Sequence, residues 1–271
     1  DGYEVGSYLN PHIVSNFKQY NNIFKDAVGT ESQNDTITTK FTGNIRLINH
    51  INFSSSETVY STRIEYTSLA NMTSIFDGNY LAIYNISLSD RADGNSSFGL
   101  FKDIYYAGVK NLTLVVDNIS AGNTSSVGAL AGVIANTNVS NITVIAAKDK
   151  SGRVTGNNYV GGLAGIIVSK DEGKLYNLSK IKSNLSIVGG KNNTETTTSI
   201  PSSFIIWDRI KPTSSSSGLT EFNNNLRLHR LPSGVYYAGG VAGILDLHQT
   251  SVVDGKAEIT KVNAYNIFVG K

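Results

Sequence analysis

The chain has 271 residues, among which there is no cysteine, one methionine, one tryptophan and only four prolines. The absence of cysteine excludes both a disulfide-stapled scaffold and a zinc–thiolate site. Charged residues are also scarce, at 16% of the chain, and the formal net charge is +2. So small an excess of positive charge gives no argument for nucleic acid or an anionic membrane as a partner. No apolar run approaches the ~20 residues that a transmembrane helix needs.

Signals for export are missing as well, since the chain opens with Asp1-Gly2-Tyr3-Glu4 rather than with a signal peptide. Asn, Ser, Thr and Gly are abundant, so solubility depends on amides and hydroxyls more than on charge. This composition is common in extracellular bacterial β-proteins. We therefore interpret the chain as a mature or excised part of a secreted or cell-surface protein. The export signal and the anchor are expected to lie outside it.

A glycine-containing phrase repeats along the chain. Residues 127–132 read Val-Gly-Ala-Leu-Ala-Gly, residues 160–165 read Val-Gly-Gly-Leu-Ala-Gly, and residues 238–243 read Ala-Gly-Gly-Val-Ala-Gly. A shorter relative, Gly99-Leu100-Phe101, precedes them. Repetition at about 30 residues indicates a solenoid, in which each repeat is one supersecondary unit stacked on the next. The glycines would allow a sharp turn, a positive φ, or close contact with the neighbouring coil.

A second phrase follows each glycine phrase and consists of an apolar residue, a variable residue and Asn, then alternating apolar and hydroxyl residues. Its asparagines are Asn111, Asn141 and Asn177, and a relative upstream of the first glycine phrase contains Asn85. The alternation is typical of half-buried strands, and the recurring Asn predicts a ladder of amides between coils at a bend. These positions are also glycosylation sequons, but a glycan there would wedge coils apart, so we assign them to stacking. The sequence thus predicts an all-β, right-handed parallel β-helix over residues 41–271.

The first 40 residues differ from the rest and are predicted to form a capping segment. Apolar residues recur at helical spacing, and Gly29 is a plausible stop, which predicts an amphipathic helix over residues 12–28. A solenoid needs a cap because its first coil would otherwise expose an apolar cross-section. A helix that binds a partner is the alternative.

The glycine phrase, followed by apolar-x-Asn-Leu-Thr-Leu, resembles the GLUG-type repeats of bacterial surface proteins. Such repeats occur in large adhesins, in autotransporter passengers and in the N-terminal region of IgA-specific metalloendopeptidases. The segment 75–85 also looks like the lead-in before the first clear repeat of those proteins, and the match covers roughly residues 40–190 and 236–271. The resemblance implies a non-enzymatic adhesin module. The alternative that it implies is the non-catalytic, substrate-positioning region of a surface protease.

An insertion at residues 191–236 separates the last two glycine phrases, which are more than twice as far apart as the preceding pair. Long insertions in solenoids map to loops on one face and are often the binding surface. The insertion contains the candidate binding residues Phe204, Trp207, Arg209, Arg227, His229 and Arg230. The predicted partner is a host cell-surface or matrix glycoprotein, or a glycan. In the alternative interpretation, Trp207 packs against the flank of the coils.

Catalytic motifs are missing from the sequence. There is no His-Glu-x-x-His, no Gly-x-Ser-x-Gly and no phosphate-binding glycine loop, and the four histidines have no ligand spacing. We therefore expect no catalytic residue, no metal and no small-molecule cofactor. A third hypothesis, a polysaccharide lyase, needs clustered acidic and basic residues that this sequence barely offers. Residues 90–95 could form a calcium turn, but we interpret them as an ordinary loop.

Overall fold

The computed structural model describes residues 4–28, 39–53, 57–69, 72–90, 97–122, 124–169, 176–190 and 237–247, with short strands at 258–260, 263–264 and 267–269. These residues form a β-solenoid of about four turns with a single α-helix, which confirms the predicted all-β, parallel β-helix. The predicted insertion at 191–236 lies outside the described residues. The strands form three parallel sheets, here named sheets A, B and C.

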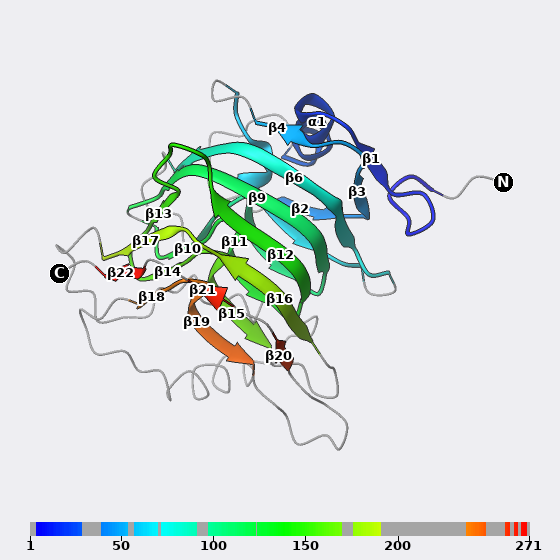
Figure 1. Ribbon diagram of the computed structural model, residues 1–271. Coiled ribbons are helices and arrows are strands. Elements are labelled where there is room, and N and C mark those ends of the chain that lie inside the picture. The colour runs from blue at the N-terminus through cyan, green and yellow to red at the C-terminus, as the bar shows by residue number, and fades with distance from the viewer. Residues whose placement is uncertain are drawn as a thin grey trace, which may run out of the picture.

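Sheet A is the largest sheet, and its long strands lie side by side along the stack (Figure 1). Its strands follow the order β1 (His12–Val14), β3 (Ile45–Leu47), β6 (Ile75–Ser89), β9 (Gly108–Ser120), β12 (Asn138–Ala146), β16 (Asn177–Ser183) and β20 (Glu258–Thr260). Shorter strands complete it: β4 (Ile51–Asn52), β13 (Arg153–Thr155), β17 (Ser186–Gly189), β21 (Asn263–Ala264) and β22 (Ile267–Val269). All of these pairings are parallel, as stacked coils require.

Sheets B and C close the other sides of each coil. Sheet B has the order β2 (Thr39–Thr42), β5 (Ile64–Thr67), β8 (Phe101–Tyr105), β11 (Ala131–Ala135), β15 (Ala164–Ser169) and β19 (Ala242–Leu247). Sheet C has the order β7 (Ser97–Phe98), β10 (Ser126–Val127), β14 (Tyr159–Gly161) and β18 (Tyr237–Gly239). A short 3-10 helix, η1 (Tyr60–Arg63), precedes β5. The chain runs from sheet C through sheet B to sheet A and then enters the next coil.

The glycine phrases form the corner between sheets C and B, and they stack in register. Val127 pairs with Val160 and Val160 with Ala238, while Ala131 pairs with Ala164 and Ala164 with Ala242. A Cβ added to Gly128 would lie 2.2 Å from Ala164 Cα in the next coil. A Cβ added to Gly161 would lie 2.6 Å from Ala242 Cα. Neither glycine has a positive φ, so close contact between coils is the reason for both.

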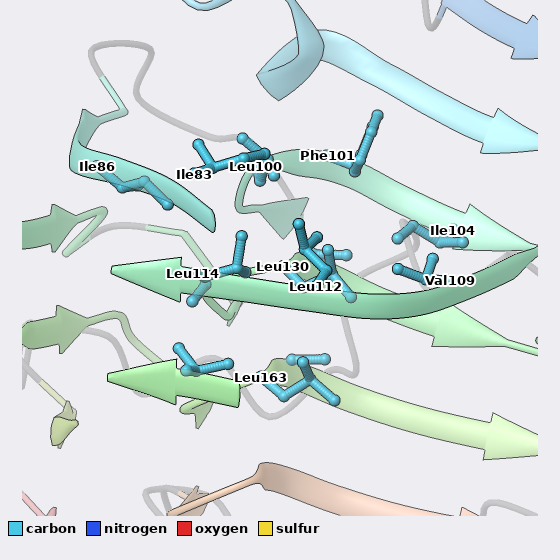
Figure 2. Packing of buried hydrophobic residues seen from close by; sticks show 14 of the residues in the cluster. Ile83, Ile86, Leu100, Phe101, Ile104, Val109, Leu112, Leu114, Leu130 and Leu163 are labelled. Carbon is cyan, nitrogen blue, oxygen red and sulfur yellow. The ribbon is translucent and has the colours of Figure 1, made fainter. Parts of the chain in front are cut away.

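The core consists of inward side chains from successive coils, which meet in the interior of the solenoid (Figure 2). Leu114 lies in register with Ile83 of the preceding coil and Val144 of the following one. All three side chains have no exposed surface. The period-2 alternation of the sequence thus gives each strand one apolar face, and stacking places like residues over like residues.

Helix α1 (Phe17–Val28) begins five residues later than predicted. His12–Val14 form strand β1, which pairs with β3 instead of continuing the helix. The start is fixed by Asn16, whose side-chain Oδ1 accepts a hydrogen bond from the backbone N–H of Gln19 at 3.0 Å. Ile13, which the sequence placed on the helix, is a half-exposed strand residue.

Helix α1 lies at the N-terminal end of the stack (Figure 1). Its apolar face packs on an aromatic cluster of the core. The Phe24 ring centroid lies 5.2 Å from that of Phe41 and 5.4 Å from that of Phe101. Tyr20 lies 5.2 Å from Phe53 and donates a hydrogen bond to Ser61 Oγ at 2.9 Å. Complete burial raises the pKa of Tyr20 well above its ordinary value. The helix therefore covers the apolar end of the first coils.

Candidate functional site

The six candidate binding residues of the insertion lie outside the described residues, but the strands on either side of the insertion are described. Strand β17 ends at Gly189, and the next described strand, β18, begins at Tyr237. Tyr237 stacks in register on Tyr159 of the preceding coil, with ring centroids 6.1 Å apart. The described coils are therefore stacked in register on both sides of the insertion, with β17 of sheet A before it and β18 of sheet C after it.

Asp90 lies one residue after the end of β6. Its carboxylate accepts a hydrogen bond from Thr124 Oγ1, and its N–H donates to Ser120 O at 3.0 Å. Asp90 thus ties two successive coils together. The rest of the predicted turn, residues 91–95, lies outside the described residues. Within the described part of the chain, no three His, Asp or Glu side chains lie close enough to hold a metal ion.

Two acidic residues, Glu65 and Asp103, lie side by side on sheet B, in register on β5 and β8. They are 1% and 2% exposed. Tyr105 Oη donates a hydrogen bond to Glu65 Oε2 at 2.6 Å, and Lys40 Nζ lies 5.8 Å from the centre of the Tyr105 ring. The sequence analysis missed this pair because neither acid belongs to a motif, and only the register of β5 on β8 unites them. A pair of carboxylates suits acid–base chemistry, but a substrate cannot reach groups buried this deeply.

A second apolar cluster lies beside this acidic pair, separate from the main core. Its members are Tyr105, Val133, Ala135, Tyr159, Ile166 and Val168. Burial, with a smaller contribution from Tyr237, raises the pKa of Tyr159 to about 12. Strands β5, β11 and β15 of sheet B are therefore buried on both faces, whereas β19 is partly exposed.

The predicted asparagine ladder is present in two coils. Asn141 Nδ2 donates a hydrogen bond to Asn111 Oδ1 at 3.0 Å, and Asn111 Nδ2 donates to Asp77 Oδ1 at 3.3 Å. Both asparagines have a left-handed backbone, with φ of 56° and 54°. Each makes a bend in its strand, as expected, because Asn tolerates this conformation better than most residues. The two side chains are half-buried rather than fully buried.

Asn85 and Asn177 do not belong to this ladder, which corrects the sequence prediction. The register pairs Ile181 with Ile142, so Lys180 and not Asn177 occupies the position next to Asn141. Asn177 instead donates its backbone N–H to Asn138 Oδ1 at 2.9 Å. Asn85 is exposed and makes a separate pair with Asn52 Oδ1 at 2.6 Å. The repeats differ in length, so equal phrases do not occupy equal positions in the coil.

The outer face of sheet A carries cationic and aromatic side chains that the sequence analysis did not single out. Lys180 and Lys182 are exposed on β16, and Lys110 Nζ lies 3.5 Å from Asp77 Oδ2. Tyr80 is 75% exposed and has a φ of 63°, in a bulge where residues 78–80 face the single residue Asn111. A bulge of this kind aims a side chain outward. The outer face of sheet A therefore offers exposed cationic and aromatic side chains.

No helix among the described residues is long and apolar enough to cross a membrane. Comparison of the chain with protein-family models, with curated proteins and with solved structures finds no match. The resemblance to GLUG-type repeats therefore rests on the repeat phrases of this chain alone.

Proposed function

We propose that this chain is a non-enzymatic binding module of a secreted or cell-surface bacterial adhesin. The solenoid acts as a rigid scaffold, and the segment 191–236 is its recognition loop for a host glycoprotein or glycan. The observation that supports this proposal is that β17 and β18, on either side of this segment, are both stacked in register on the preceding coil.

A solenoid tolerates such an insertion because each coil contacts mainly its neighbours, and the flanking strands β17 and β18 pair with β13 and β14 of the preceding coil. Rigid scaffolds commonly carry their binding residues on loops of this kind. Residues 204–210 and 227–230 of the insertion supply tryptophan, phenylalanine and arginine, which dominate binding energy at protein interfaces. The GLUG-type resemblance supports the bacterial surface setting.

The test is to replace residues 195–233 with a short Gly/Ser linker in the full chain. The far-ultraviolet circular dichroism and the melting temperature should stay close to those of the wild type, because the coils on both sides remain stacked. Attachment to host cells or to immobilised matrix glycoprotein should be lost. If the variant stays folded and still attaches at full strength, the recognition surface lies on the coils. If it unfolds, the insertion is part of the scaffold.

A pair of point variants sharpens this test without removing any chain. Trp207→Ala with Arg209→Ala removes the proposed anchors, whereas Ser215→Ala with Ser216→Ala changes two small residues of the same insertion. Truncation of an interface anchor typically costs about 2 kcal/mol or more, so the loss of both anchors, about 4 kcal/mol, should lower affinity by roughly several hundredfold. The serine variant should bind as the wild type does. Equal binding by both variants would remove Trp207 and Arg209 from the site.

A further inference from the structure

Strand β16 departs from the repeat on its outward face. The register aligns Ser179-Lys180-Ile181-Lys182 with Ser140-Asn141-Ile142-Thr143 of the preceding coil. Serine and isoleucine are retained, while asparagine and threonine are both replaced by lysine. The strand before, β9, has Asn111 and Thr113 at the same two positions. The buried isoleucine is thus retained in the core, and only the two outward side chains change, from uncharged to positively charged.

The lysine at position 180 does not stabilise the backbone. Lys180 has a φ of 53°, a left-handed conformation that is strained for most L-residues and that asparagine tolerates better. Its side chain is exposed, as is that of Lys182. The structure gives neither lysine an ion-pair partner in the described part of the chain. A residue that is unfavourable for its backbone conformation and makes no stabilising contact is expected at positions that function requires.

The neighbouring strands add one further unpaired cation to the outer face of sheet A. The exposed Arg46 on β3 donates to Asn79 Oδ1 at 3.4 Å, whereas the charge of Lys110 on β9 is offset by Asp77, whose Oδ2 lies 3.5 Å from Lys110 Nζ. Hydroxyl and amide side chains lie between these cations, at Thr143 and Asn141. Strands β3, β6, β9, β12 and β16 are successive neighbours, about 4.8 Å apart. The row from Arg46 on β3 to Lys180 on β16 therefore spans roughly 19 Å, which suits an extended polymer rather than a compact ligand.

We propose that this outer face of sheet A binds an anionic polysaccharide that crosses the strands from β3 to β16, with Lys180 and Lys182 as its main anchors. The lysines pair with sulfate or carboxylate groups, and the amides and hydroxyls between them bond to sugar hydroxyls. Tyr80 adds rigid, amphipathic contact area next to Arg46. Nucleic acid would favour more cations than this, with aromatic residues between them. This proposal does not rest on the recognition loop proposed above.

The experiment measures binding of the full chain to two probes, a sulfated polysaccharide and a polyuronic acid, with a DNA duplex as a third probe. The test variant combines Lys180→Asn with Lys182→Thr, which restores the residues of the preceding coil and should not impair folding. The control combines Lys148→Asn with Lys150→Thr, two exposed lysines in the turn that follows β12. Both variants lose the same charge, so they differ only in where that charge lies.

The test variant should bind at least one polysaccharide about tenfold more weakly, because it loses two charge contacts that form at solvent-exposed side chains. The control should change affinity less than twofold. The probe that shows the loss identifies the anionic group as sulfate or carboxylate. Equal losses in the two variants, no binding of either polysaccharide, or tighter binding of DNA would each overturn the proposal. The Gly/Ser variant of residues 195–233 should keep this binding even if the recognition loop fails its own test.

Discussion

Asn111 and Asn141 combine a backbone role with an inter-coil role. Each residue adopts the left-handed conformation at a bend, and its side-chain amide bonds to the neighbouring coil. The sequence predicted both roles because an asparagine that recurs at one point of the repeat, beside alternating residues, is typical of a bend between stacked strands. It could not predict that Lys180 takes the next position, because that depends on an inter-coil register which repeats of unequal length do not fix.

Replacing Asn141 with Leu should lower the free energy of unfolding by about 1–3 kcal/mol. The change removes the hydrogen bond to Asn111 Oδ1 and places a bulky side chain at a φ of 56°. Urea denaturation measures the loss. Asn118→Leu is the matched control, since Asn118 faces outward on β9 with an ordinary backbone. A loss of the same size in both variants would show that the ladder contributes nothing specific.

Among the elements, α1 has a buried face that the sequence predicted and a start that it did not. Its apolar spacing predicted an amphipathic helix, and the face formed by Phe17, Tyr20 and Phe24 is buried as that spacing requires. The predicted start was wrong because Ile13 fits the helical period by coincidence. The actual start depends on the Asn16 cap and on the pairing of β1 with β3, and a tertiary pairing of this kind leaves no periodic signal.

Phe24→Ala should destabilise the fold by about 3–5 kcal/mol, because the ring is fully buried between Phe41 and Phe101. The helix would then cover the first coils poorly, and their apolar end would become available for association. Urea denaturation gives the stability, and light scattering gives the association state. Lys25→Ala changes the exposed neighbour on the same helix and should alter neither measurement. Comparable stability of the two variants would mean that α1 is not a cap.

The whole molecule is a stack whose coils contact mainly their neighbours, and this explains which features the sequence could predict. Similar residues stack on one another in successive coils, so the repeated phrases and their alternation were enough to predict the fold. The pairing of Glu65 with Asp103 and the lysines of β16 escaped prediction. These features are not repeated, and they emerge only when the coils are placed in register. Side chains that depart from the repeat, such as this acidic pair and these lysines, therefore cannot be predicted from the repeat pattern.

A one-atom change at a corner should reveal this nearest-neighbour organisation. A Cβ at Gly161 would lie 2.0 Å from Ala164 O and 2.6 Å from Ala242 Cα, whereas a Cβ at Gly189 would meet nothing closer than 3.6 Å. We therefore expect Gly161→Ala to loosen the coil that contains β18 and β19, while the first coils stay stacked. Hydrogen exchange should show lost protection over 237–247 and retained protection over 97–120, and Gly189→Ala should resemble the wild type. Uniform loss of protection along the whole chain would instead show that the solenoid unfolds as one cooperative unit.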